Sequence, residues 1–512
     1  MTRLLSVCTV VVLLVVATVG GLGHGAPAVQ RGGRLTFALR GDAVTLDFLL
    51  STSPEDRIIY RAVYDPLFEI DENLNVVPWL VERWDVSPDG KVYTFSLRRG
   101  VKFHDGTDLN AEAVKINFDR ILNPANRSPL RADMASVQRV DVVDSHTVRV
   151  ALSEPFAPFL SILTDRNGYI VSPAAIERHG RDLSRNPVGT GPFQFVEWVK
   201  DDRITFRRNA AYWRRGEPFL DELVFRVVPD DTVRLTMLRT GQVDLADWVD
   251  PRDVRKVKAS PHLAIYEVES FGFDMIRLNV SRPPFDNKLV RQAFAWAVDR
   301  EALRTVAYRG TGSAAVGPIP PRMWAFDSAL RAYSYDPNRA RALLQQAGLP
   351  GGVSFALQVR NVPLDQTRAQ LVQQQIAAAG LRASIQLVDI GTLLGNLRTG
   401  AFEASQSFWS GRVDPDGNMF RHFHTSAIQG GTNFMRYSNA QVDRLLDRAR
   451  EITDVNERRR LYAEAQRFIV DDAPMIFTNY FPVLKAASKR VQGLKVLPDP
   501  SILSYREIWL QR

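Results

Sequence analysis

The alternation of apolar and polar residues predicts strands in the first half of the chain. Leu35, Phe37 and Leu39 alternate with small or polar residues, as expected of a strand with one buried face. Strand signals then dominate from about 75 to 188, where the turn Ser87-Pro-Asp-Gly90 has Pro and Gly at the positions that a tight hairpin turn favours. The pattern predicts a separate strand-rich unit with few parallel-sheet signals.

Strands and helices alternate in the rest of the chain. A strand over 222–228, a helix capped by Asp230 or Asp231 and a strand over 243–248 have the lengths of a parallel crossover unit. Asp336-Pro337 opens another helix. The elements expected after it are a strand over 353–359, a helix from Asp365 to Ala379, a strand from Ile385, a helix near 391–399 and a strand near 402–408. This order predicts an open α/β sheet.

The stretch Phe408-Trp-Ser-Gly-Arg-Val-Asp-Pro-Asp-Gly-Asn418 follows the last of these strands. Three of its eleven residues are Gly or Pro, which predicts a loop and neither a helix nor a regular strand. In open α/β sheets the ligand crevice lies outside the carboxyl ends of the strands. Arg360 ends the strand over 353–359 in the same way, so two arginines and two aromatic residues are expected on one rim of a cleft between lobes.

The amino-terminal segment predicts export. A single arginine precedes an apolar run from Leu4 to about Val19, and small residues follow, so 1–28 is expected to be a signal peptide cleaved after Gly25 or Ala28. The alternative, an uncleaved anchor helix, is disfavoured by the short run. Cys8 lies at the start of the run and not past its end, which argues against a lipid anchor. The protein is therefore expected in the periplasm.

Composition excludes several functions of the mature chain. Cys8 is the only cysteine, so after cleavage no disulfide, thiolate metal site or cysteine nucleophile exists. The 65 Lys and Arg residues are scattered among 57 Asp and Glu, without the basic stripe that nucleic-acid binding needs. No phosphate loop, Gly-x-Ser-x-Gly elbow or His-Glu-x-x-His helix occurs, so neither an enzyme nor a cofactor is expected. His422-Phe-His424 would place two imidazoles on one face if extended, which is an incomplete metal site, and packing or surface histidines are expected instead.

Seven short stretches occur in order through the mature chain. They are Tyr64-Asp-Pro-Leu-Phe68, Pro78-Trp-Leu to Trp84, Ser87-Pro-Asp-Gly-Lys91, Arg99-Gly-Val-Lys-Phe-His-Asp-Gly106, Gly189-Thr-Gly-Pro-Phe193, Pro284-Phe285 through Arg291-Gln-Ala-Phe294 to Asp299-Arg300, and Tyr335-Asp-Pro337 to Ala347-Gly348. With them the chain resembles the solute-binding proteins of ABC importers in the dipeptide, oligopeptide and nickel class, which are the family 5 extracellular solute-binding proteins.

The resemblance implies an α/β, two-lobed periplasmic-binding-protein fold with a hinge and an extra strand-rich domain. A monomer is expected to enclose a small-molecule or peptide-like solute between the lobes by hinge closure and to present it to the membrane permease, whose ATPases are on other chains. The implied division is a signal peptide 1–28, a discontinuous lobe I from 29–73 with 189–277 and 478–512, an extra domain II from 74–188, and a lobe III from 278–477.

One motif departs from the family pattern. Peptide binders of this class resemble Trp-x-x-Asp followed by Asp-Pro-Asp, and the first Asp holds the α-ammonium of the peptide. This chain has Trp409-Ser-Gly-Arg412 and then Asp414-Pro-Asp416, one residue shorter, which puts Arg412 in the ammonium-binding place. A guanidinium suits a carboxylate or phosphate. The departure predicts a solute with an acidic group, or a peptide-like compound with a blocked or sugar-modified amine. Alternatively, Arg412 pairs with Asp414 or Asp416 and only braces the loop.

The resemblance also completes the expected ligand-binding set. Arg360 matches the place where dipeptide binders hold the peptide carboxylate, and the stretch Phe271-Gly-Phe273 lies where the family lines its cleft. Alternative functions are an ordinary dipeptide or oligopeptide binder, a nickel-complex carrier, and, least favoured, a secreted hydrolase. The expected ligand-binding residues are Arg360, Phe408, Trp409, Arg412, Asp414, Asp416, Phe271 and Phe273, with no metal ligand among them.

Overall fold

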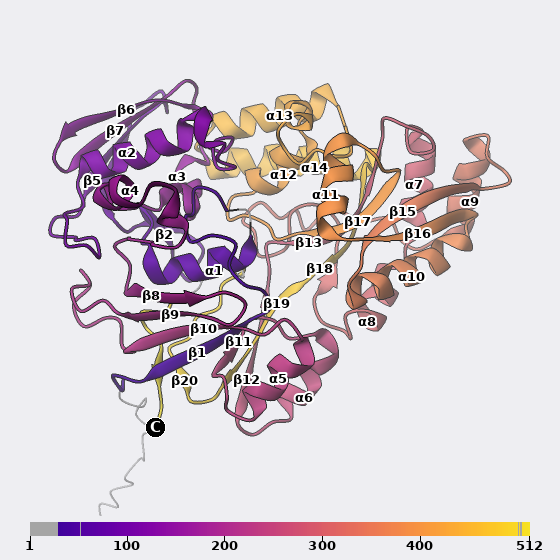
Figure 1. The fold of residues 1–512 in the computed structure, drawn as a ribbon. Helices are drawn as coiled ribbons and strands as arrows, with labels where there is room; N and C mark the ends of the chain where they lie inside the picture. Colours follow the sequence, from indigo (N-terminus) through magenta and orange to yellow (C-terminus); the bar gives the residue numbers. More distant parts are fainter. Residues whose placement is uncertain (1–28, 52, 500, 502–503) are drawn as a thin grey trace, which may run out of the picture.

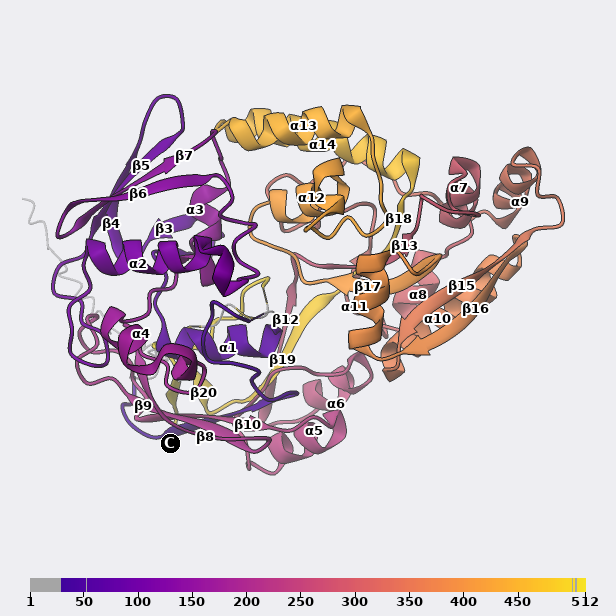
Figure 2. The same cartoon turned by 45° about the horizontal axis from the view of Figure 1, so that its top comes forward.

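Three large sheets, of seven, six and four strands, organise the part of the chain that the structure describes. The structure is a computed structural model that describes residues 29–51, 53–499, 501 and 504–512. The predicted signal peptide, 1–28, lies outside the described residues. Figures 1 and 2 show the seven- and six-stranded sheets in two bodies, and the four-stranded sheet with its helices above the first.

The seven-stranded sheet gathers strands from distant parts of the chain in the order β12-β19-β11-β1-β10-β9-β8. Its strands are β1 (Arg34–Leu39), β8 (Phe193–Val199), β9 (Arg203–Arg208), β10 (Glu222–Val227), β11 (Leu245–Ala246), β12 (Leu263–Glu269) and β19 (Pro482–Ser488). Strands β10 and β11 both run parallel to β1 and lie on its two sides. The predicted parallel crossover through α5 (Asp231–Arg239), capped by Asp230, is confirmed, with β1 inserted between its two strands.

The strand-rich segment forms an antiparallel four-stranded sheet in the order β4-β5-β7-β6. The hairpin predicted at Ser87-Pro-Asp-Gly90 is confirmed, because Gly90 N donates to Ser87 O across the turn. Helix α2 packs on this sheet with the side chains of Val114, Phe118 and Ile121 fully buried. The elements here are β4 (Val81–Val86), β5 (Val92–Leu97), β6 (Val137–Asp144), β7 (Thr147–Leu152), α2 (Ala111–Leu122), α3 (Phe159–Ile162) and α4 (Pro173–His179).

The six-stranded sheet has the order β14-β18-β13-β17-β15-β16, and the predicted α/β alternation builds its β15-β16 edge. Its strands are β13 (Phe273–Leu278), β14 (Ser313–Ala314), β15 (Val353–Arg360), β16 (Leu381–Val388), β17 (Ala404–Trp409) and β18 (Met475–Tyr480). Strand β15 pairs in parallel with β16 and β17, so Arg360 and Trp409 do end neighbouring parallel strands. The helices of this body are α7 (Lys288–Trp296), α8 (Arg300–Val306), α9 (Pro337–Gln346), α10 (Pro363–Ala377), α11 (Ile390–Thr399), α12 (Asp416–Phe423), α13 (Ala440–Glu451) and α14 (Val455–Asp472).

The expectation that 408–418 is wholly a loop is wrong. Phe408 and Trp409 are the last residues of β17, where they pair with β13. Helix α12 begins at Asp416, directly after Pro415. Proline is tolerated at a helix start because the first N–H groups of a helix have no intrahelical partner, so the Gly and Pro content did not exclude a helix here. Only 410–415 connects the two elements.

Two short crossovers join the two large sheets. Strand β12 continues into β13 through Ser270 to Gly272, and β18 continues into β19 through Phe481. Figure 2 shows these paths running side by side between the two bodies. A Cβ on Gly272 would lie 2.4 Å from the carbonyl oxygen of Trp409 and 2.5 Å from Cζ of Phe481, so only glycine lets these segments approach so closely.

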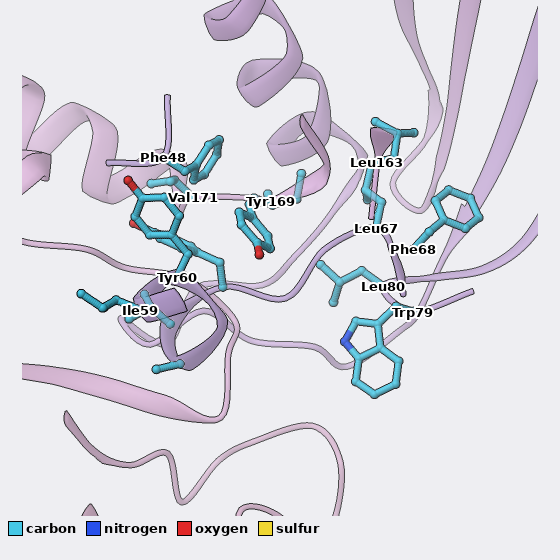
Figure 3. Packing of buried hydrophobic residues seen from close by; sticks show 14 of the residues in the cluster. Phe48, Ile59, Tyr60, Leu67, Phe68, Trp79, Leu80, Leu163, Tyr169 and Val171 are labelled. Atoms are coloured by element: carbon cyan, nitrogen blue, oxygen red, sulfur yellow. The ribbon is translucent and has the colours of Figure 1, made fainter. Parts of the chain in front are cut away.

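A shared aromatic core ties the strand-rich unit to the seven-stranded body. Tyr169 packs beside Phe48 and Tyr60, with ring centroids 5.7 and 6.2 Å away (Figure 3). Tyr60 is on α1 (Pro54–Val63). Aromatic side chains supply much of the burial energy of a core, so this cluster holds the segment around Tyr169 firmly against α1. The remaining short elements are β2 (Phe68–Ile70), β3 (Val76–Pro78), α6 (Val254–Lys258), β20 (Val491–Gln492) and β21 (Trp509–Leu510).

Candidate ligand-binding site

A cavity of about 70 Å³ lies between the segment 156–167 and the start of α12. The first side is held by the aromatic core on α1, and the second follows the end of β17. The cavity wall is rich in charge. Its charged residues are Arg57, Arg166, Arg412, Arg421 and Arg450, with Asp133, Asp165, Asp414, Asp416 and Asp499. Which of these charges neutralise one another decides what the cavity can bind.

Arg57, on α1, is fully compensated by two aspartates. Its Nη2 lies 2.6 Å from Oδ2 of Asp165 and 2.8 Å from Oδ2 of Asp499. Burial acts to raise the pKa of both carboxyls, but the positive charge of Arg57, joined at Asp165 by those of Arg166 and Arg412, outweighs it and holds the pKa of each below its usual range. Both aspartates are therefore ionised, and two carboxylates share one guanidinium.

Asp414 and Asp416 pair with arginines of the two long helices, α14 and α13. Arg458 reaches Asp414 with both terminal nitrogens, at 2.7 and 3.0 Å, and Nε of Arg450 lies 3.0 Å from Oδ1 of Asp416. A fork-to-fork pair of this kind positions both partners. The ion pair of Arg412 with Asp414 or Asp416, which the loop-brace alternative expects, is therefore absent from the described residues.

Arg412 is half-buried in the wall and has no ion-pair partner in the described residues. No carboxylate oxygen of the described residues lies within 4.0 Å of its guanidinium nitrogens. Its Nη1 donates to the carbonyl of Gly411 at 2.7 Å, and Cζ lies 4.8 Å from the centroid of the Trp409 ring. Burial first, and then the positive charges of Arg57, Arg421 and Arg166, lower the pKa of the group to about 9. The guanidinium is held in place while its charge is left uncompensated.

Gly417 makes room for the Arg412 side chain. A Cβ on Gly417 would lie 2.5 Å from both Cβ and Cγ of Arg412, far inside normal contact distance. The aliphatic stem of Arg412 thus lies directly on the backbone of the first turn of α12. This contact, together with the Trp409 ring, fixes the direction of the side chain.

Arg166 is a second arginine without a carboxylate partner in the described residues. Its side chain donates through Nη1 to the carbonyl of Ser51, and its Nε has no hydrogen-bond partner there. The residue is only 8% exposed, and burial lowers its pKa. Neighbouring Asp165 pairs through Oδ2 with Arg57 and forms no ion pair with Arg166, although its charge acts to raise the pKa of Arg166. Sequence reasoning missed Arg166; the one signal was a charged Asp165-Arg-Asn167 interrupting an apolar stretch.

Arg360 belongs to a different cluster and does not line the cavity. Its Nε lies 2.6 Å from Oδ2 of Asp365, in the first turn of α10. Arg368 continues the network, with Nη1 2.9 Å from both Asp365 and Asp274. The short connection from β15 into α10 brings Asp365 back onto Arg360, so the expected carboxylate-binding arginine is already occupied. Phe408 lies under Arg360 at 4.7 Å and is likewise outside the cavity wall.

The other expected aromatic residues support the site from behind. Phe271 and Phe273 are 2% and 0% exposed, inside the core of the body that contains α12. Trp409 is half-buried, and its Nε1 donates to Oδ1 of Asn418 at 2.9 Å. Of the eight expected residues, the structure therefore brings Arg412, Asp414 and Asp416 to the cavity wall. The nearby Arg57, Arg166, Asp165 and Asp499 come from segments that the sequence did not single out.

The histidines of 422–424 do not form a metal site. His422 lies within α12, not in an extended segment, and its buried ring packs 4.7 Å from Trp409. Burial lowers its pKa well below the usual value, so the ring is neutral. His424 stacks on Phe420 at 4.2 Å. In the described ranges no group of three or more His, Cys, Asp or Glu residues could hold a metal ion, and no helix is long and apolar enough to cross a membrane.

A larger depression, of about 540 Å³, lies elsewhere, between α10 and the edge strand β16. It is open to solvent, and the side chains that line it are glutamines, a serine and small or aliphatic residues. It has no ionisable group with which to recognise a charged solute. The charged cavity between the two bodies is therefore the better candidate for a binding site.

A cavity between two α/β bodies joined by paired crossovers is the arrangement of a hinged binding protein. The chain belongs to family 5 of the bacterial extracellular solute-binding proteins, whose family model for the middle region matches residues 75–431. Proteins of this class are the substrate-binding components of ABC importers, so this chain is a solute-binding protein of that kind.

Individual relatives agree with this assignment. The glutathione-binding protein GsiB of Salmonella choleraesuis is 34% identical over 475 residues, which cover 91% of this chain and 92% of the relative. The periplasmic binding protein DppA of Helicobacter pylori, solved with the peptide STSA, has a TM-score of 0.85 at 28% identity and covers 94% of this chain and 99% of its own. The binding protein AgaA of A. tumefacien R10, solved with agropinic acid, has a TM-score of 0.84 at 28% identity over the same shares.

Proposed function

We propose that this protein captures an acidic, peptide-like solute between its lobes for import, and that glutathione is the first candidate. The observation that supports this proposal best is the half-buried guanidinium of Arg412, which lines the cavity wall without an ion-pair partner in the described residues. Removing a charge from water without pairing it is unfavourable. A solute carboxylate would supply the missing counter-charge through a charge-assisted hydrogen bond.

The neighbouring charges argue against a solute that presents only an ammonium here. Asp414 and Asp416 already pair with Arg458 and Arg450. An ammonium beside Arg412 would be repelled, and no carboxylate on that side is left to hold it. Ordinary peptides, which have a free ammonium and a single terminal carboxylate, therefore fit this side of the cavity only through their carboxyl end.

The ligands of similar proteins also support an acidic solute. One relative at 34% identity is named for binding glutathione, and a structural neighbour was solved with agropinic acid. Glutathione is a γ-glutamyl tripeptide with two carboxylates and one ammonium. Its net charge of about −1 suits a site with surplus positive charge. These resemblances make a γ-glutamyl peptide the first compound to test.

We further propose that the lobes separate for the solute to enter. The cavity volume of about 70 Å³ is too small for a tripeptide. The crossovers at 270–272 and 481 are the points about which the lobes would turn. We propose the same division as above: lobe I comprises 29–73, 189–277 and 478–512, domain II comprises 74–188, and lobe III comprises 278–477. A monomer in the periplasm would then present the loaded form to a permease and its ATPases.

Isothermal titration calorimetry tests the proposal. The wild type, Arg412→Met and Arg360→Met would each be titrated with γ-Glu-Cys-Gly, with Ala-Ala, and with Ni²⁺ plus histidine. We expect the wild type to bind γ-Glu-Cys-Gly and Arg412→Met to bind it roughly 10- to 100-fold more weakly, because a hydrogen bond to a charged group is lost. Arg360→Met is the matched control, since it removes the same charge outside the cavity and should leave the affinity unchanged.

The alternatives predict different results. If Ala-Ala binds the wild type and Arg412→Met equally and γ-Glu-Cys-Gly does not bind, the protein is an ordinary peptide binder and the proposal is wrong. Binding only of the nickel–histidine complex would identify a nickel-complex carrier. A thermal-shift measurement gives an independent readout, because a ligand at a hundred times its Kd adds about 2.7 kcal/mol to stability.

A further inference from the structure

Arg166 and Arg412 line the cavity from opposite sides. Arg166 belongs to the segment packed on α1, and Arg412 belongs to the connection between β17 and α12. Arg166 is buried and Arg412 is half-buried, and neither has a carboxylate oxygen of the described residues within 4.0 Å. Every other arginine of the cavity wall has an aspartate partner. The two guanidiniums therefore share the lack of an ion-pair partner in the described residues.

The Asp165 carboxylate, next to Arg166 in the sequence, can still accept a hydrogen bond. Both hydrogen bonds from Arg57 to Asp165 end on Oδ2, at 3.0 and 2.6 Å. Oδ1 of Asp165 accepts no hydrogen bond within the described part of the chain. Asp499 shares the same guanidinium, so two carboxylates stand against one arginine in this ion-pair group. A guanidinium without an ion-pair partner, at Arg166, and a carboxylate with one oxygen that accepts no hydrogen bond, at Asp165, are therefore sequence neighbours on one wall of the cavity.

We infer that Arg166 and Asp165 together bind the free α-amino-acid head of the solute, its carboxylate at Arg166 and its ammonium at Asp165, while Arg412 binds a second carboxylate at the other end. The inference rests on the proposed function. It narrows the solute class to isopeptides such as γ-glutamyl peptides, whose head has both an ammonium and a carboxylate. An α-linked peptide has no carboxylate on its first α-carbon, so it would leave the guanidinium of Arg166 unpaired.

The charge balance of the whole cavity agrees with this class. With Arg458, which pairs with Asp414, six arginines face five aspartates and leave one net positive charge. A solute with two carboxylates and one ammonium has one net negative charge and would neutralise the closed cavity. A peptide with a single carboxylate and an ammonium is neutral, so the surplus charge would stay buried.

Solute analogues that lack one group at a time test the assignment. The wild type and Arg166→Met would be titrated calorimetrically with γ-Glu-Cys-Gly, with 4-aminobutanoyl-Cys-Gly, which lacks the head carboxylate, and with glutaryl-Cys-Gly, which lacks the ammonium. We expect Arg166→Met to bind γ-Glu-Cys-Gly roughly 10- to 100-fold more weakly than the wild type does, because a hydrogen bond to a charged group is lost. We expect both proteins to bind 4-aminobutanoyl-Cys-Gly with the same affinity, because the group that Arg166 would contact is absent from it.

Controls separate this assignment from folding defects and from the proposed function. Arg131→Met removes one exposed arginine of the same domain outside the cavity wall and should bind like the wild type. Far-UV circular dichroism and Tm establish that Arg166→Met is folded. If the wild type binds γ-Glu-Cys-Gly and folded Arg166→Met binds it equally well, the assignment of Arg166 is wrong although the proposed function stands. If the wild type binds no acidic peptide, both are wrong.

The ammonium half of the assignment has its own test. Glutaryl-Cys-Gly should bind the wild type at least tenfold more weakly than γ-Glu-Cys-Gly. Its head has a carboxylate but no ammonium, so the Asp165 carboxylate would be repelled by the solute and would have no cation to bind. Equal affinity for the two compounds would show that Asp165 does not bind the ammonium.

Discussion

Two arginines at the same edge of one sheet behave differently. Arg360 ends β15 and lies 4.7 Å from the Phe408 ring, and Arg412 follows the parallel strand β17 and lies 4.8 Å from the Trp409 ring. Arg360 pairs with Asp365, whereas Arg412 has no carboxylate partner in the described residues. The residue type and the sheet edge are the same for the two arginines. What distinguishes a structural arginine from a candidate ligand-binding arginine is whether a carboxylate of the protein pairs with it.

The surroundings of the two arginines extend this difference. Beyond Asp365, Arg368 is buried between two carboxylates, and although burial acts against it, Asp274 and then Asp365 raise the pKa of its guanidinium. Around Arg412 the near charges are mostly other arginines, so burial and repulsion act together and lower the pKa. Around Arg360 and Arg368 every charge has a partner within the protein. Around Arg412 we expect the solute to supply the missing negative charge.

Breaking the paired cluster should have the largest effect. Arg368→Met would leave Asp274 and Asp365 without their shared partner at 2.9 Å, and removing one member of a buried pair costs about 3–5 kcal/mol. Urea unfolding followed by circular dichroism measures this loss. Arg448→Met is the control: its pair with Glu451 is exposed, so its loss should cost about 1 kcal/mol or less. Equal, small losses in both variants would contradict the difference drawn between the two regions.

A smaller change should disturb the unpaired arginine without altering any charge. In Gly417→Ala the new Cβ would come 2.5 Å from the Arg412 stem and push the guanidinium from its place over Trp409. We expect the affinity for γ-Glu-Cys-Gly to fall about tenfold, which corresponds to about 1.4 kcal/mol of binding free energy. The unfolding free energy should change little. Calorimetry and urea unfolding measure the two quantities. Gly395→Ala in α11, where the added Cβ meets nothing within 4 Å, should change neither. Unchanged affinity in Gly417→Ala would show that the position of Arg412 is not important.

The smallest expected effect is the part of the pH dependence of stability that comes from Asp274 in the paired cluster. Burial, and then the Asp365 carboxylate, raise the pKa of Asp274 to about 6, against the opposing effects of Arg368 and Tyr308. The folded protein thus holds this proton more tightly than the unfolded chain, so the contribution to stability grows as the pH falls through 6 and is lost as the pH rises. Between pH 7 and pH 5 the unfolding free energy of the wild type should rise by about 1 kcal/mol relative to Asp274→Asn.

Urea titrations of both proteins at several pH values measure this difference. A difference that does not change with pH would mean that Asp274 stays ionised throughout the range. In the cavity, Arg57 holds the pKa of Asp165 and Asp499 low, so these two carboxylates should contribute no change in the affinity for γ-Glu-Cys-Gly over the same pH range.

Local elements of the fold were predictable because their causes lie within a few residues. Asn110 caps α2 by accepting from Ala113 N, and Asp336 caps α9 by accepting from Arg339 N, as their positions before apolar helical stripes indicate. Alternation predicted the hairpins and the α/β order. The stretch 408–418 was assigned wholly to a loop because Gly and Pro also occur at the ends of strands and helices.

Part of the candidate site could be predicted from the sequence. Arg412, Asp414 and Asp416 stand in one motif that departs from the family pattern, and the structure places all three in the cavity wall. Arg57 and Arg166 stand in no motif, and they reach the cavity only because the aromatic core around Tyr169 holds their segments together.

The sequence by itself determined the local elements, the family and the motif that exchanges an expected aspartate for Arg412. Only the tertiary structure decided which charges are compensated. Arg57 finds Asp499, 442 residues away, and Arg368 pairs with Asp274, on the strand that leaves the crossover. An ion pair depends on distances of a few ångströms between side chains, and chain folding sets those distances independently of separation in sequence. The unpaired arginines, and with them the proposed solute, become visible only when all the pairs are known.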